Sequence, residues 1–148
     1  MSSTPLFSAS QFVESCADWR DAIILCARPL IAQGAISPGY HDAIIRETEQ
    51  TGPWYLLSPG FALPHARPED GVTSAMTHLS LLRIREYVRF PGDEKVGLLI
   101  LLAAGNGEQH LQTIQTLMCW LDENDRLARL LRIETAPALT QFLQAERP

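Results

Sequence analysis

The chain has 148 residues, of which 46% are hydrophobic and 20% charged, and its formal net charge is −5. This length suits one domain with one core, and the apolar fraction excludes a disordered chain. The 17 acidic residues against 12 basic ones argue against a partner bound by phosphate neutralisation, so we expect no nucleic acid.

The apolar runs and the cysteines narrow the class further. The longest apolar run, Leu98–Ala104, is far short of the roughly 20 residues that a membrane-spanning helix needs. The N-terminus has no basic region followed by a long apolar run, so we expect no secretory signal and a cytoplasmic protein. Three cysteines without zinc-ligand spacing indicate reduced thiols and no metal site.

The first part of the chain predicts two helices after an irregular arm over residues 1–9. Asp18 is a good N-cap for the first helix, which should bend at Pro29 and end at Gly34. Ser37 is the expected N-cap of the second helix, which starts with Pro38 and ends at Gly52.

The middle of the chain predicts strands. Two short pieces, 54–57 and 61–63, flank the turn at 58–60, and 77–82 alternates as a half-buried strand does. The continuous apolar run 96–104 is typical of a central strand covered on both faces.

Three further helices are expected over 108–121, 124–131 and 137–145. Helices before, between and after strands indicate a single α/β sandwich domain over residues 1–148, a mixed sheet with helices packed on it.

Histidine is the side chain whose pKa normally lies near neutrality, so each of the four is a candidate for chemistry. His41 should lie on the outer side of its helix, and His78, at a strand start, should be structural or at the surface. No HxxxH or HxxE spacing exists, so a metal site is not expected.

His65 is the strongest candidate from the residues alone. Pro64 fixes its own φ and holds Leu63 in extended geometry, so a stiff segment presents the imidazole at a strand end. Sites of α/β sheets lie at such ends, and Arg67 follows two residues later. The alternative is a histidine in an ordinary proline-rich loop.

His110 also follows a strand end. The turn 105–107 contains two glycines, and a helix begins directly after it, where unpaired N–H groups favour an anion. Together, His65, His110 and Arg67 suggest a phosphate site.

The segment 52–71, GPWYLLSPGFALPHARPEDG, strongly resembles the active-site segment of phosphotransferase-system enzyme IIA domains of the mannitol/fructose type. Its ending, Pro-His-Ala-Arg-Pro-Glu, is most similar to the ascorbate-type and cryptic-mannitol-type branch. The resemblance covers essentially the whole chain: 18–22 and 37–52 match the family's first two helices, and 110–117 matches the helix with its second histidine.

This resemblance implies a phosphoryl carrier with a mixed sheet of about five strands flanked by helices on both faces. It implies that His65 accepts the phosphoryl group from the histidine of HPr and passes it to a cysteine of the cognate enzyme IIB. The membrane enzyme IIC would then be served indirectly, during uptake of a sugar, polyol or related acid. His110 would be the helper histidine, and no cofactor is implied.

Departures from the family pattern and rival functions leave alternatives open. Ser58 stands where close relatives often have alanine, so its hydroxyl is a candidate to face the site. A phosphate contact by Arg67 is our inference from the residues and is not implied by the resemblance.

A regulatory phosphoprotein of the nitrogen branch is the main alternative function, although such proteins usually have Pro-His-Gly. A small hydrolase with a His/His or His/Asp pair has no supporting nucleophile motif.

Overall fold

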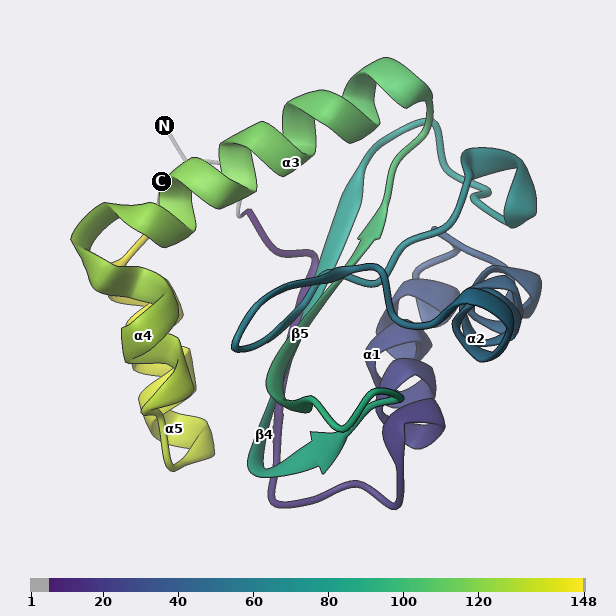
Figure 1. The fold of residues 1–148 in the computed structure, drawn as a ribbon. Helices are drawn as coiled ribbons and strands as arrows, with labels where there is room; N and C mark the ends of the chain where they lie inside the picture. The colour runs from purple at the N-terminus through teal and green to yellow at the C-terminus, as the bar shows by residue number, and fades with distance from the viewer. Residues whose placement is uncertain (1–5, 148) are drawn as a thin grey trace.

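The computed structural model describes residues 6–147, which form a five-stranded mixed sheet with helices on both faces (Figure 1). The strand order is β1-β4-β5-β3-β2. β1 pairs parallel to β4, β4 antiparallel to β5, β5 parallel to β3 and β3 antiparallel to β2. The predicted fold class, one α/β sandwich domain, is therefore confirmed.

The elements follow one another in this order: β1 Ala9–Val13, α1 Trp19–Ala32, α2 Pro38–Thr51, β2 Leu56–Ser58, β3 Gly60–Ala62, the 3-10 turn η1 Pro68–Asp70, β4 His78–Arg89, β5 Lys95–Ala103, α3 Gly107–Asp122, the 3-10 turn η2 Glu123–Asp125, α4 Arg126–Leu131 and α5 Ala136–Ala145.

β5 is the centre of the sheet, as its apolar run predicts. Alternate side chains of a strand point to opposite faces, and both faces of β5 are buried in a hydrophobic cluster. Leu99 and Leu101 belong to one cluster, whereas Leu98 and Ile100 belong to the other. α1 and α2 cover the first face of the sheet, and α3, α4 and α5 cover the second (Figure 1).

The first two helices begin and end where their caps predict. The Asp18 carboxylate accepts a hydrogen bond from the backbone N–H of Asp21 at 2.9 Å. α1 continues through Pro29, whose missing N–H frees the carbonyl of Leu25, and the amide of Gln11 on β1 donates to that carbonyl at 2.9 Å. This hydrogen bond links α1 to β1.

His41 is a correction to the sequence prediction, because it is buried rather than on the outer side of α2. α2 contacts both α1 and η1, so the covered stripe of the helix is wider than one apolar row. His78 has the expected structural role, with its two ring nitrogens 2.9 and 3.3 Å from the hydroxyls of Ser8 and Ser74.

The structure extends the sheet beyond the predicted strands. The predicted arm reaches residue 9, and its residues 1–5 lie outside the described part. In the described part, Leu6 and Phe7 pack against the core and β1 starts at Ala9, a strand that the sequence analysis missed. β4 runs to Arg89 rather than ending at residue 82, and its Arg83 is almost fully buried.

Arg83 is accommodated because main-chain carbonyls accept its protons. Its guanidinium donates to the carbonyls of Leu130 and Leu131, at 3.0 and 2.8 Å, and also to strand carbonyls. These contacts tie the end of α4 to the sheet. α4 itself starts later than predicted because Asn124 and Asp125 have positive φ values of 55° and 57°.

No helix within residues 6–147 has the length and apolar character needed to cross a membrane.

Candidate functional site

His65 follows β3 at the end of the sheet where β5 also ends. The chain before it is tied to β5, since the N–H of Leu102 donates to the carbonyl of Pro64 at 3.1 Å. Leu63, Pro64 and Ala66 are all buried, whereas His65 itself is partly exposed. The stiff presentation of this imidazole predicted from Pro64 is therefore found.

The tautomer of His65 is set by its own main chain. Nδ1 lies 2.7 Å from the carbonyl oxygen of Leu63, and because a carbonyl only accepts, Nδ1 carries the proton. In the neutral ring Nε2 then has the free lone pair.

The protonation state of His65 is set mainly by burial. Desolvation lowers its pKa below the usual value of 6.5, the hydrogen bond to Leu63 opposes this, and the nearby His110 lowers the pKa further. The ring is thus neutral at pH 7 and Nε2 is available as a nucleophile.

His110 lies against His65, although 45 residues separate them in sequence. The two ring centroids are 4.6 Å apart with an interplanar angle of 62°. His110 sits in the first turn of α3, where the Asn106 side chain accepts from the N–H of Gln109 at 2.9 Å. Burial also lowers the pKa of His110. The two histidines that the sequence singled out are therefore neighbours.

The start of α3 offers free donors beside these rings. The N–H groups of Gly107 and Glu108 are in the first turn and donate to no acceptor within residues 6–147. Gly107 lines the same pocket as the two histidines. The helix end is therefore a suitable place for a phosphoryl oxygen.

Trp54 is a site residue that the sequence analysis did not identify, because it counted the tryptophan as part of a strand. Its ring meets His65 edge-on, with centroids 4.5 Å apart and an interplanar angle of 88°. The side chain is 48% exposed. A large aromatic side chain left in solvent beside a candidate nucleophile is a functional feature that only the folded structure shows.

These residues line one shallow pocket. Its walls are formed by Glu47, Trp54, His65, Ala66, Arg67, Pro68, Gly107 and His110. The pocket thus combines two neutral imidazoles with one cationic and one anionic side chain at its rim. Glu47, from α2, was not predicted to face it.

Arg67 lines the pocket but points largely into solvent. Its side chain is 74% exposed, and Nε lies 3.5 Å from the Asp70 carboxylate and 3.7 Å from that of Glu69. The Asp70 carboxylate also accepts from the N–H of Arg67 at 3.1 Å. The contact of Arg67 with Asp70 is therefore observed, whereas a phosphate contact by Arg67 stays a prediction.

Ser58 does not face this pocket. Its hydroxyl is buried at the end of β2, and the residue lines a separate pocket with residues of α3 and α4. The expectation that Ser58 is a candidate to face His65 is therefore wrong, because Ser58 lies beside the last turn of α3, whereas His65 lies beside the first.

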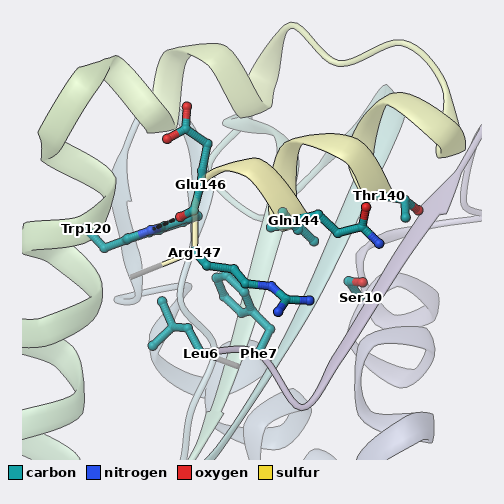
Figure 2. A pocket seen from close by; sticks show the side chains of 9 residues that line it. Leu6, Phe7, Ser10, Trp120, Thr140, Gln144, Glu146 and Arg147 are labelled. Atoms are coloured by element: carbon teal, nitrogen blue, oxygen red, sulfur yellow. Dashed lines mark hydrogen bonds between the residues drawn. The ribbon is translucent and has the colours of Figure 1, made fainter. Parts of the chain in front are cut away.

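A further pocket lies at the other end of α3, between β1 and α5 (Figure 2). Phe7 and Trp120 form its aromatic wall, and Arg147 lies across it. Trp120 is ten residues beyond His110 on the same helix, which is about 15 Å along the axis. This pocket is therefore separate from the one at His65.

Within the described range 6–147, no three His, Cys, Asp or Glu side chains are grouped so that they could hold a metal ion.

In comparison with known proteins, almost the whole chain matches one protein family. Residues 8–146 match the family described as "Phosphoenolpyruvate-dependent sugar phosphotransferase system, EIIA 2". The mannitol-specific cryptic phosphotransferase enzyme IIA component of Escherichia coli K12 is 37% identical over 137 residues, which cover 92% of each chain. The ascorbate-specific PTS system EIIA component of the same strain is 35% identical over 115 residues, 74% of this chain and 73% of that protein.

Two solved structures are similar throughout. The solution structure of the mannitol-specific cryptic enzyme IIA from Escherichia coli has a TM-score of 0.84 and 36% identity, covering 96% of this chain and 99% of that one. The complex of enzyme IIA and phosphorylated enzyme IIB for mannitol, also from Escherichia coli, matches with a TM-score of 0.72 and 25% identity over 93% and 94% of the chains.

Proposed function

This chain belongs to the EIIA 2 family of the phosphoenolpyruvate-dependent sugar phosphotransferase system, and from that premise we propose that it carries a phosphoryl group on Nε2 of His65. The hydrogen bond between Nδ1 and the Leu63 carbonyl, at 2.7 Å, is the observation that carries the proposal. It leaves Nε2 as the ring nitrogen with the free lone pair, which supports attack from that atom. The proposal treats residues 1–148 as one enzyme IIA domain.

The first step moves the phosphoryl group from HPr to His65. The lone pair of Nε2 attacks the phosphorus of phospho-HPr in line with the bond to the donor histidine. That P–N bond breaks as the new one forms, and its electron pair returns to the donor ring. Nδ1 of His65 keeps its proton throughout and donates a hydrogen bond to the Leu63 carbonyl, which stabilises the positive charge that develops on the ring.

The second step passes the group to a cysteine of enzyme IIB. Its thiolate attacks phosphorus, the bond to Nε2 breaks, and the electron pair returns to His65, which is again neutral. The membrane enzyme IIC is involved only indirectly, because it transports the sugar that enzyme IIB phosphorylates. Neither step requires a metal or a cofactor.

Charge stabilisation is the main demand in phosphoryl transfer. The ring of His110 and the free N–H groups at the start of α3 supply donors beside the reacting nitrogen. Arg67 adds a positive charge at the rim of the pocket. His110 is thus proposed as the helper, and Arg67 as a weaker phosphate contact.

The rim of the pocket is suited to protein partners. Trp54 and Leu111 are 48% and 59% exposed, and Leu111 follows His110 directly. Of these two, Trp54 lines the pocket, and an exposed large apolar side chain at a shallow pocket is typical of a docking surface. We therefore propose that HPr and the cognate enzyme IIB dock here in turn, in the cytoplasm.

A sugar or ascorbate-type carrier fits better than a nitrogen-branch regulator. The relatives at 37% and 35% identity are named for mannitol and ascorbate, and the chain has Pro-His-Ala-Arg-Pro-Glu where the regulators usually have Pro-His-Gly. The regulator remains the alternative function, and a hydrolase has no supporting feature.

A stepwise transfer assay tests the proposal. Incubation with labelled phosphoenolpyruvate, enzyme I and HPr should add one phosphoryl group, which cognate enzyme IIB then removes. His65→Ala should accept none. Labelling of that variant at the normal rate would show that the nucleophile lies elsewhere, and labelling that enzyme IIB leaves in place would favour the regulator.

A further inference from the structure

We propose that the buried hydroxyl of Tyr40 positions His65 for phosphoryl transfer, by tying the loop that carries His65 to the end of β5. The inference rests on the proposed function of His65. Tyr40 touches no reacting atom, so its role is that of a positioning residue.

The hydroxyl of Tyr40 connects two main-chain groups that are distant in sequence. It donates to the carbonyl of Leu102 on β5 at 2.6 Å and accepts from the N–H of Ala66 at 3.1 Å. Its single proton is assigned to Leu102 because that distance is shorter than the 3.1 Å to the carbonyl of Ala66. The chain directly after His65 is thus linked to β5 through one oxygen atom.

The chain directly before His65 is linked to the same residue of β5. The N–H of Leu102 donates to the carbonyl of Pro64 at 3.1 Å. Leu102 therefore anchors both neighbours of His65, Pro64 directly and Ala66 through Tyr40. Without the hydroxyl, only the anchor before His65 remains.

The environment of Tyr40 keeps this link intact. Tyr40 is fully buried, and burial raises the pKa of its phenol to about 12, so the hydroxyl keeps its proton across the working range. Ala66 is 6% exposed, so water does not readily replace the lost acceptor if the hydroxyl is removed. The loop would have to shift to satisfy the Ala66 N–H.

The consequence for chemistry follows from the position of the ring. His65 lies between the two anchored residues and holds its reactive tautomer through a short contact with Leu63. A displacement of this loop by about 1 Å changes the line of attack and can slow transfer by up to about a hundredfold. We expect Tyr40→Phe to reduce the rate roughly ten- to a hundredfold.

Tyr55→Phe is the matched control. Tyr55 is also buried, its pKa is also raised to about 12, and its hydroxyl lies 2.7 Å from Thr48 Oγ1. Both tyrosines belong to the same hydrophobic cluster. Each variant therefore loses one buried hydroxyl, but only Tyr40→Phe loses a contact with the His65 loop.

The test measures the full chain and both variants by melting, by steady-state transfer from phospho-HPr, and by ¹⁵N NMR of the histidine rings. For Tyr40→Phe we expect a lower kcat with KM little changed, and a smaller fraction of His65 with its proton on Nδ1. Tyr55→Phe should retain the tautomer and lie within about twofold of the wild-type kcat, even where its melting temperature falls equally. The proposal would be overturned if the two variants had the same fraction of His65 with its proton on Nδ1 and the same kcat.

Amide hydrogen exchange on the unaltered protein gives an answer that needs no variant. The N–H of Ala66 should be protected to a degree comparable with that of Leu102, and rapid exchange at Ala66 would overturn the link. The tautomer and exchange measurements use unphosphorylated protein, so they test the positioning role of Tyr40 whether or not His65 accepts a phosphoryl group. A His65 that accepts no phosphoryl group would refute the proposed function instead.

Discussion

Gly105 lies where β5 leads into α3, and Gly105→Ala tests whether the contact beneath this turn sets the position of His110. A Cβ atom at this position would lie 2.4 Å from the carbonyl oxygen of Ala75 and 3.0 Å from Oε1 of Gln109. That Gln109 oxygen accepts from the Thr77 hydroxyl at 2.8 Å and from the Gly105 N–H at 3.3 Å. The added methyl group therefore forces apart the loop before β4 and the start of α3.

The size of the effect follows from the overlap. An ordinary contact begins near 3.4 Å, so Gly105 and Ala75 must separate by about 1 Å. Overpacking of this kind costs about 1–3 kcal/mol, which for this size of domain lowers the melting temperature by roughly 2–12 °C. A shift of the α3 start also displaces His110 from His65, so we expect phosphoryl transfer to slow about ten- to a hundredfold.

Thermal melting and the transfer assay together measure this prediction, with Gly39→Ala as the control. A Cβ atom at Gly39, in the first turn of α2, would meet its nearest atoms at 3.5 and 3.7 Å, and alanine favours the helix. Gly39→Ala should therefore melt at or slightly above the wild-type temperature and transfer normally. If Gly105→Ala behaved in the same way, the packing of Ala75 on Gly105 would not position His110, and the reasoning would be refuted.

Three further changes separate the roles of the site residues. His110→Ala should still accept phosphate from HPr but pass it on slowly, because the ring beside the phosphohistidine is lost; unchanged transfer to enzyme IIB would remove His110 from the mechanism. Arg67→Gln should slow phosphorylation severalfold and shift the melting temperature by less than about 2 °C, since the exposed ion pairs of Arg67 stabilise little. A fall in both the melting temperature and the rate would instead assign Arg67 a role in shaping its loop. No effect on either would show that Arg67 is a solvated surface residue. Because burial lowers the pKa of both histidines below the usual 6.5, the rate of phosphorylation should change little around neutral pH and fall as the pH drops through their lowered values. The same shift makes protonation favour the unfolded chain, so stability is lost over that acidic range, and a rate that rose on acidification would contradict a neutral nucleophile.

Local signals explain what could be predicted from the sequence. The helix bounds follow from caps such as Asp18, and the central strand follows from the apolar run of β5. The stiff Pro64 indicated how His65 is presented, and the glycine-rich turn indicated where α3 begins. Each of these features depends on residues within a few positions of one another.

The features that were missed depend on contacts between distant residues. β1 and the second half of β4 gain their strand character from pairing, and Arg83 is buried because carbonyls of Leu130 and Leu131 accept its protons. His41 is buried on α2, a helix that contacts both α1 and η1. The contact of Trp54 with His65 exists only once the β2–β3 turn folds back.

The nitrogen atom that carries the phosphoryl group decides between attack by Nε2 of His65 and every other route. After phosphorylation by HPr, NMR of protein labelled with ¹⁵N-histidine should show phosphorus coupled to Nε2 of His65, with Nδ1 still protonated and bonded to the Leu63 carbonyl. Phosphorus on Nδ1 of His65, on His110 or on a residue other than histidine would contradict the account.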